Sequence, residues 1–272
     1  MRRKEIAKKL GITMMALMLA LPCAVPVICP ADEIDAETAA EAPAEDEAVT
    51  QDPETAESSE GLKLTMKTFK KEYKTEDGLV YKEISFEYPL AEDKSEAAQA
   101  LNKFYKNLLS KWKKAAVKDL EEAEEIVTEN KDHGGHYSDQ VTCEIICNDK
   151  DYISVLQTGY EYTMGAHGLP YRYTYIFDAK TGKKVSAASL LGMSKNKLNQ
   201  KVRSLYLKKY DNTQKAEDYM FYQDRSEVKA TLDKTDFNQN LYYLKNGKVR
   251  FYVYPYAVGP YAAGFIEVAV KL

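Results

Sequence analysis

The chain has 272 residues, with 38 Lys and Arg against 42 Asp and Glu and a formal net charge of −4 at pH 7. Binding of nucleic acid usually needs a concentrated basic stripe, and this balance gives no reason to expect one. We therefore expect no nucleic-acid partner.

The N-terminus has the order of a secretory signal. Five basic residues precede an uncharged apolar run over residues 10–28, and Cys29-Pro30-Ala31 resembles a cleavage site. A run of 19 residues is close to the length that spans a bilayer, but Pro22 and Pro26 disfavour a helical anchor. We expect residues 1–31 to be a signal peptide, with retention as a single membrane anchor as the alternative.

Residues 32–60 differ sharply in composition from what precedes them. The segment contains twelve Asp or Glu and no Lys or Arg. Such a segment repels itself and has little to bury, so we expect an acidic disordered spacer. It either tethers the body away from membrane or wall, or only solubilises it. The first 30 residues carry +4 and the spacer −12, which leaves +4 for residues 61–272.

The body begins with strands and a long helix. Residues 62–66 and 80–88 alternate apolar and polar side chains, with a turn at residues 75–78, as in a hairpin. From about Lys94 to Val127, apolar residues recur every three or four positions, which predicts one long helix capped near Ser95. A second hairpin is expected over residues 137–162. We assign residues 61–150 to a first α+β subdomain.

Cys143 and Cys147 lie in a strand-like run of the second hairpin. Alternation predicts that both face the same side of the sheet. Four residues along a strand span about 13 Å, whereas a disulfide needs Cα atoms within about 7 Å. We therefore expect two buried free thiols.

The remaining chain, residues 151–272, is assigned to a second α+β subdomain. A strand over residues 171–177 is followed by a helix from Lys195 to Tyr210, capped by Ser194. Residues 211–236 are ambiguous; a hairpin around Asn246-Gly247 and a last strand over residues 265–270 follow. The predicted fold is α+β, with antiparallel sheets, one long and one shorter packing helix, and two intimately associated subdomains.

Two C-terminal motifs resemble a bacterial extracellular domain family. They are Tyr160-Glu-Tyr-Thr-Met-Gly-Ala-His-Gly168 with Tyr173-Thr-Tyr-Ile-Phe-Asp-Ala-Lys-Thr-Gly182, and Phe251-Tyr-Val-Tyr-Pro-Tyr-Ala-Val-Gly-Pro-Tyr-Ala-Ala-Gly264. The family includes the outer domain of the lysozyme-sensing anti-sigma-V factor and the non-catalytic region of a peptidoglycan deacetylase (PdaC-like). The segment with Ile84-Ser-Phe-Glu-Tyr-Pro89 and the long helix is similar to the companion domain that usually precedes it.

The resemblance implies a module that binds something or supports a catalytic neighbour, with no catalysis of its own. The chain lacks the deacetylase's Thr-Phe-Asp-Asp motif, and only about ten residues precede the apolar run. A sigma-binding role is therefore not expected. The resemblance adds lysozyme-like protein and cell-wall glycan as candidate partners.

Three histidines are the candidates for metal or acid–base chemistry. His133-Gly-Gly-His136 could bring two imidazoles onto a metal, but no supporting motif surrounds it, and we interpret it as a loop without metal. His167 lies between glycines in a corner that suggests tight backbone geometry. It either satisfies buried carbonyls or contacts a ligand. No nucleophile motif accompanies it, and no cofactor is expected.

Tyrosine is abundant, with 21 copies. One group, Tyr160, Tyr162, Tyr171, Tyr173 and Tyr175, surrounds His167 in sequence; another, Tyr252, Tyr254, Tyr256 and Tyr261, surrounds two prolines. Such rings suit protein or carbohydrate recognition, or simply line half-exposed sheets. The candidate ligand-binding residues are His167, Tyr162, Tyr171, Tyr254, Tyr256 and Tyr261.

The sequence thus predicts an extracellular or envelope-associated module that is not an enzyme and contacts a lysozyme-like protein or peptidoglycan. The alternative is an enzyme that modifies envelope glycan, with His167 paired to a carboxylate distant in sequence. That alternative predicts a pocket containing His167.

Overall fold

The computed structural model describes residues 61–216 and 220–272. They belong to one compact unit, Glu37–Leu272. The predicted signal peptide (residues 1–31) and acidic spacer (residues 32–60) lie outside the described residues, so both stay predictions. None of the described helices is long and apolar enough to cross a membrane.

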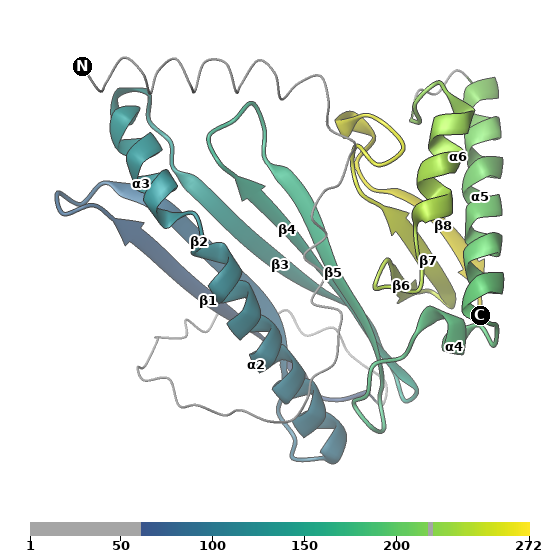
Figure 1. Cartoon of the computed structure of the whole chain (residues 1–272). Helices are drawn as coiled ribbons and strands as arrows, with labels where there is room; N and C mark the ends of the chain where they lie inside the picture. The colour runs from purple at the N-terminus through teal and green to yellow at the C-terminus, as the bar shows by residue number, and fades with distance from the viewer. Residues whose placement is uncertain (1–60, 217–219) are drawn as a thin grey trace. The chain divides into compact units, whose positions relative to one another are not determined.

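Five strands form the first sheet, in the order β1-β2-β3-β4-β5 (Figure 1). They are β1 (Leu64–Lys74), β2 (Val80–Ala91), β3 (Tyr137–Asn148), β4 (Tyr152–Tyr162) and β5 (Leu169–Asp178). Three of the pairs are antiparallel, as predicted, but β2 and β3 are parallel. The chain leaves β2, passes through two helices and returns to start β3 in the same direction, which is the long crossover that a parallel pair requires.

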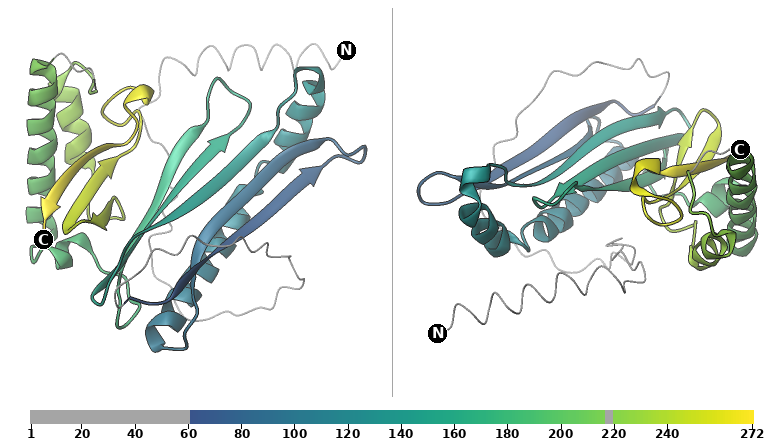
Figure 2. Two further views of the ribbon diagram at one scale, coloured as in Figure 1. Left: turned by 180° about the vertical axis from the view of Figure 1, so that it is seen from behind. Right: turned by 90° about the horizontal axis from the view of Figure 1, so that it is seen from above.

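Helices α2 (Glu96–Ala116) and α3 (Leu120–Glu129) lie along one face of this sheet (Figures 1 and 2). Ser95 caps α2 as predicted, because its hydroxyl accepts a hydrogen bond from the Ala98 amide at 3.1 Å. The single long helix predicted over residues 94–127 is divided into two. At the division, Asp119 forms an ion pair with Lys82 of β2, which is buried. This ion pair ties the break to the sheet. The short 3₁₀ helix η1 (Lys131–His133) follows α3.

The second sheet contains β6 (Tyr242–Lys245), β7 (Lys248–Val253) and β8 (Ile266–Lys271), in that order and antiparallel. Its hairpin turns at Asn246 and Gly247 as predicted, with φ of 52° and 65°. A type I′ turn needs positive φ at both central residues, which explains this Asn-Gly pair. The 3₁₀ helix η2 (Tyr261–Ala263) precedes β8.

Helices α4 (Ala187–Leu190), α5 (Lys195–Lys215) and α6 (Arg225–Lys234) accompany the second sheet. Ser194 caps α5 as predicted, but the helix continues five residues beyond the predicted end at Tyr210. The stretch that the sequence leaves ambiguous contains α6. Its cap is Asp224, whose carboxylate accepts a hydrogen bond from the Ser226 amide at 2.7 Å. The α+β fold class is confirmed.

Strand β5 serves both hydrophobic cores. One core lies between α2 and the five-stranded sheet, and the other joins α5 and α6 to the three-stranded sheet. Tyr175 and Phe177 are buried in the first core, whereas Ile176 is buried in the second. This is the alternation expected of a strand that is covered on both faces.

The two sheets divide the chain later than the predicted boundary at residues 150 and 151. That boundary falls in the turn between β3 and β4, which pair from Ser138 opposite Tyr162 to Asn148 opposite Ile153. Strands β4 and β5 therefore belong to the first sheet, and the change of sheet occurs between β5 and β6. The division of the chain between the two sheets depends on which strands pair by hydrogen bonds, and the sequence does not reveal this pairing.

Cys143 and Cys147 are free, as predicted, but half-buried rather than buried. They also face opposite sides of the sheet. A bulge between Ile145 and Cys147 shifts the register, so Cys143 contacts the α2 core and Cys147 the α5 core. Burial raises the pKa of Cys147 to about 12, and at neutral pH this thiol is protonated and a poor nucleophile.

Candidate functional site

Two loops meet at the candidate site. One follows β4 into β5, and the other connects β7 to β8. The Tyr261 hydroxyl donates to the Gly168 carbonyl at 3.0 Å, and His167 Nε2 lies 3.0 Å from the Tyr256 hydroxyl. We call residues 160–169 and 254–265 together the aromatic corner.

His167 is held by partners from both loops. Its Nδ1 lies 3.0 Å from the Gly168 carbonyl oxygen. A carbonyl can only accept, so Nδ1 carries a hydrogen, and in the neutral imidazole Nε2 accepts from the Tyr256 hydroxyl. The ring stacks on Tyr261, with centroids 4.0 Å apart and planes 23° apart. The imidazole is thus fixed as one tautomer within a group of tyrosine rings.

The backbone of the aromatic corner is tight. A Cβ atom on Gly168 would lie 2.5 Å from the Glu161 carbonyl oxygen and 2.6 Å from the Tyr160 ring, so glycine alone fits there. The Gly168 amide donates to the Tyr160 hydroxyl at 2.8 Å. Met164 and Tyr256 have positive φ values of 60° and 66°. Non-glycine residues at positive φ are strained and gather at functional sites.

Exposed apolar side chains occur in both segments of the aromatic corner. Among the described residues, four large hydrophobic side chains are exposed: Tyr160 (42%), Leu169 (52%), Tyr256 (37%) and the C-terminal Leu272 (48%). The first three all belong to the aromatic corner. Exposed apolar residues scattered singly need no explanation. Several of them on two segments that bond to each other make this region the candidate for an interaction surface.

The structure brings together three of the six predicted site residues, His167, Tyr256 and Tyr261. Tyr171 lies elsewhere, on the α2 face of β5. Its hydroxyl donates to the Asp139 carboxylate and accepts from the Trp112 indole at 3.0 Å. Burial raises the pKa of Tyr171. This tyrosine is a core residue and is not available to a ligand.

Tyr162 and Tyr254 are also separate from His167. Tyr162 ends β4 opposite Ser138, and within residues 61–216 and 220–272 no hydrogen bond or ring contact joins it to His167. The Tyr254 hydroxyl donates to the Arg172 carbonyl at 3.2 Å, and its ring packs on Tyr252 and Phe265. Tyr254 therefore fastens its loop to β5.

Sequence reasoning misses two members of the aromatic corner. The sequence groups Tyr160 with the other tyrosines without singling it out, and nothing in the sequence draws attention to Leu169. Both sit beside Gly168 and are exposed. An exposed leucine cannot be distinguished from a core leucine by residue type, so this part of the site emerges only from the fold.

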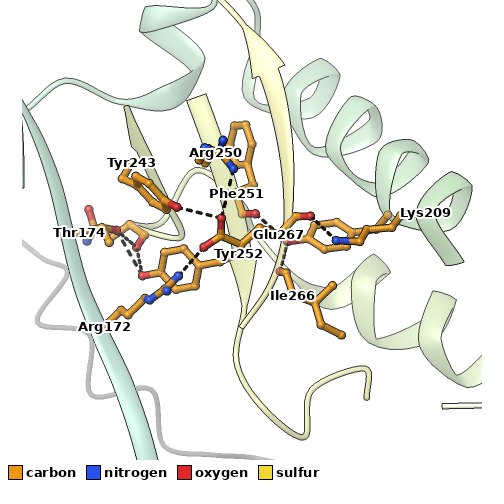
Figure 3. A network of polar contacts seen from close by, with 11 residues as sticks. Arg172, Thr174, Lys209, Tyr243, Arg250, Phe251, Tyr252, Ile266 and Glu267 are labelled. Atoms are coloured by element: carbon orange, nitrogen blue, oxygen red, sulfur yellow. Dashed lines mark hydrogen bonds and ion pairs between the residues drawn. The ribbon is translucent and has the colours of Figure 1, made fainter. Parts of the chain in front are cut away.

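A second polar region joins β5 to the three-stranded sheet (Figure 3). Arg172 forms an ion pair with Glu267 at 2.7 Å, and both side chains are largely buried. The Arg172 guanidinium also lies 3.9 Å from the centre of the Phe265 ring. The Tyr243 hydroxyl donates to Glu267 at 2.8 Å, and Lys209 of α5 donates to the Glu267 carbonyl at 3.0 Å. We call this group the sheet junction.

A third polar group is buried beneath α2. Asp139 accepts a hydrogen bond from Tyr171, and desolvation raises its pKa to about 6. Glu161 raises that pKa further, whereas Lys82 lowers it. Tyr171 and Trp112 leave this carboxylate enclosed, so it is suited to stabilising the fold and not to contact with a ligand.

The two histidines considered for metal binding have different surroundings. His133 is exposed at the end of η1, and His136 Nε2 lies 3.6 Å from a Glu83 carboxylate oxygen. No group of three or more His, Cys, Asp or Glu suited to a metal ion occurs in the part of the chain that the structure describes.

The chain matches the models of two known domain families. Residues 74–170 match the family model of deacetylase PdaC, and residues 192–272 match that of a protein family of unknown function, DUF3298. The chain carries these two domains in tandem. The suspected family is therefore confirmed. Domains of these kinds are typical of extracellular or envelope-associated proteins.

Solved structures agree in fold. A DUF3298 family member from Bacteroides fragilis is 18% identical, with a TM-score of 0.55 over 79% of this chain and 92% of that one. A DUF3298 family protein from Pseudomonas aeruginosa is 16% identical, with a TM-score of 0.51 over 77% and 90%. No curated protein matches the chain.

The matched ranges place the aromatic corner across both domains. Residues 160–169, with His167, lie in the PdaC match, and residues 254–265 lie in the DUF3298 match. The hydrogen bonds from Tyr256 to His167 and from Tyr261 to Gly168 therefore connect one domain to the other. Neither domain alone would form this surface.

Proposed function

We propose that this protein is an extracytoplasmic, non-enzymatic binding module of the bacterial cell envelope whose contact surface is the aromatic corner. The exposure of Tyr160, Leu169 and Tyr256, in the two segments that the His167 hydrogen bond joins, is the observation that carries the proposal. Their rings and aliphatic carbons lie in water although the hydroxyls of both tyrosines are already satisfied within the protein. A partner that covers them gains apolar burial without breaking these bonds.

A lysozyme-like protein fits this surface better than wall glycan does. Sugars stack on flat aromatic rings that face an open groove, whereas the most exposed member here is the branched side chain of Leu169. Tyrosine is enriched among the residues that dominate binding at protein interfaces. Peptidoglycan is the alternative ligand, and the experiment below separates the two.

The geometry gives the glycan-modifying alternative less support. A general base needs a carboxylate or similar group to orient it, as well as a free nitrogen. In His167 both ring nitrogens are engaged, by the Gly168 carbonyl and the Tyr256 hydroxyl. The neighbours of His167 are suited to holding a loop in one conformation.

The test is retention on immobilised lysozyme and, in parallel, on purified insoluble peptidoglycan. We expect the wild-type protein to bind lysozyme, and Leu169→Ser and Tyr256→Ala to weaken binding about tenfold or more, as expected for interface anchors. Retention only on peptidoglycan would assign the surface to glycan. Retention on neither would refute both versions of the proposal.

Leu272→Ser is the matched control. Leu272 is exposed to a similar degree as Leu169, but its amide bonds to Gly247 at the opposite end of the β7–β8 pair. We expect this variant to bind as the wild type does. Equal losses for Leu169→Ser and Leu272→Ser would show that general surface hydrophobicity, and not the aromatic corner, mediates retention. His167→Ala would abolish turnover only if the enzymatic alternative held.

A further inference from the structure

Helix α5 is far more basic than the chain as a whole. It contains seven Lys or Arg and one acidic residue, Asp211. Lys197, Lys201 and Lys208 are exposed, and their spacing of four and seven residues places them along one side of the helix. We call these three side chains the α5 stripe.

The α5 stripe is not neutralised by its surroundings. Asp211 is engaged by Arg225 of α6, with Oδ1 at 2.8 Å from Nε, and Asp236 is engaged by Lys195 at 3.1 Å. Within the described residues, Lys197, Lys201 and Lys208 have no ion-pair partner. Their charges therefore face solvent.

A groove of about 470 Å³ runs beside the α5 stripe, between α5 and α6. Leu207 contributes apolar surface, and Gln200, Ser204 and Lys208 contribute polar groups. Arg203, which also lines it, donates to the carbonyls of Leu232 and Thr235 and so closes the end of α6. Two carboxylates in the lining are already paired, Asp211 with Arg225 and Asp233 with Lys229. Lys208 is the member of the α5 stripe that lines the groove, so the groove adjoins one end of the stripe.

The other basic helix is a poorer site for an anion. Helix α2 has five lysines and one acidic residue, but α3, which follows after three residues, has five glutamates and no basic residue. The net charge of α2 and α3 together is thus −1, whereas that of α5 and α6 together is +7. An anion near α2 meets the field of α3, and an anion on α5 meets no comparable repulsion.

We propose that the acidic segment of the same chain, residues 32–60, docks on the α5 stripe and its groove. The segment has twelve acidic residues and no basic one, which complements the unpaired lysines. Its 29 residues can extend to about 100 Å, so the connection at Gly61 allows it to reach α5. Attachment to the same chain gives an effective concentration on the order of millimolar, which favours this occupant over a free anion.

The contact is electrostatic. Opposite charges that meet in water attract weakly and are screened by salt, so the contact should weaken as ionic strength rises. This inference is independent of the function proposed for the aromatic corner, because the two surfaces share no residue.

The test is zero-length carbodiimide crosslinking of the chain from residue 32 to residue 272, with the linked peptides mapped by mass spectrometry. An equal mixture of isotope-labelled and unlabelled protein distinguishes links within a chain from links between chains. We expect links from residues 32–60 to Lys197, Lys201 and Lys208, within one chain, several-fold above links to Lys103, Lys106 and Lys114 of α2. Links spread evenly over both helices, or formed between chains, would overturn the proposal.

Salt and charge reversal provide a second readout. The links should fall as ionic strength rises from about 0.02 M to about 0.5 M, which shortens the Debye length from roughly 20 Å to roughly 4 Å. A triple variant, Lys197→Glu, Lys201→Glu and Lys208→Glu, should release the segment, whereas Lys103→Glu, Lys106→Glu and Lys114→Glu should not. Far-UV circular dichroism checks that both variants are folded. Binding of added polyphosphate can be compared between the wild type and a variant in which the twelve carboxylates of residues 32–60 are replaced by amides. Equal binding to both would assign the α5 stripe to an external polyanion instead.

Discussion

Tyrosine rings occur at the aromatic corner and at the sheet junction, and the two regions differ in whether those rings are exposed or buried. In both regions tyrosine hydroxyls are satisfied: Tyr261 bonds to Gly168 at the corner, and Tyr206 donates to Phe251 or Ile266 behind the junction. Tyr206 and Tyr252 are fully buried, whereas Tyr160 and Tyr256 are exposed. The hydroxyl bonds position the residues in both regions, and the exposure of the ring distinguishes a surface from a core.

This difference predicts opposite consequences of substitution. At the sheet junction, changes should lower the free energy of unfolding, because buried partners are left unpaired. At the aromatic corner, changes should leave folding nearly intact and affect only the contact with a partner. Stability measurements can therefore assign each residue to one region or the other.

Glu267→Gln should cause the largest loss of stability at a fixed pH. It leaves the Arg172 guanidinium, whose side chain is only 15% exposed, without its carboxylate, and it weakens the bond from the Tyr243 hydroxyl. Removing one partner of a buried ion pair is strongly destabilising, and because this pair is partly solvated we expect a loss of about 2 kcal/mol. Urea denaturation monitored by circular dichroism measures it.

Asp151→Asn is the matched control for that loss. Asp151 pairs with Lys180, and these side chains are 49% and 72% exposed. Such a surface pair contributes little, so the change should stay within about 0.5 kcal/mol. Equal effects of Glu267→Gln and Asp151→Asn would contradict the structural role assigned to the sheet junction.

Asp139→Asn should change how stability depends on pH. The pKa of Asp139 is raised by desolvation from 3.8 to about 6, so between these values the folded protein holds a proton that the unfolded chain has lost. The free energy of unfolding therefore falls as pH rises through this window, by at most about 3 kcal/mol, and then levels off. The groups that face this carboxyl are Tyr171, Glu161, Lys82 and Asp119.

The measurement is urea unfolding at several pH values from 4 to 8, for wild type and Asp139→Asn. We expect the variant to gain stability relative to the wild type as pH rises, because the amide that replaces the carboxyl carries no charge to desolvate. Taking the difference removes the contribution of other carboxyls. A difference that stays constant with pH would show that Asp139 does not titrate in this window.

Local patterns predict most of the secondary structure. The caps at Ser95 and Ser194 and the turn at Asn246-Gly247 follow from the sequence because each depends on a few neighbouring residues. The division of the long helix does not, and the ion pair at the break joins Asp119 to Lys82, which is distant in sequence. The bulge before Cys147 escapes prediction for a related reason, because pairing with β4 defines it.

Half of the predicted site residues come together in the structure. Contacts between residues distant in sequence again decide which ones do. His167 and Tyr256 come from motifs far apart in the chain, and the structure joins them. Tyr171 is a candidate only because it is near His167 in sequence, but it lies within β5 and points to α2. Whole-chain charge is also a poor guide, since a body of +4 conceals the separation of basic α5 from acidic α3.

The smallest effects come from removing single hydroxyls, and they compare the two regions most directly. Tyr206→Phe removes the buried hydroxyl that donates to the Phe251 or the Ile266 carbonyl, so we expect a loss of about 1–2 kcal/mol. Tyr256→Phe removes the donor to His167 Nε2 at an exposed position, where water replaces it, so we expect a change within about 0.5 kcal/mol. Thermal unfolding of both variants tests this. A loss at Tyr256 as large as that at Tyr206 would mean that the aromatic corner is part of the structural core, and its exposed rings would no longer indicate a binding surface.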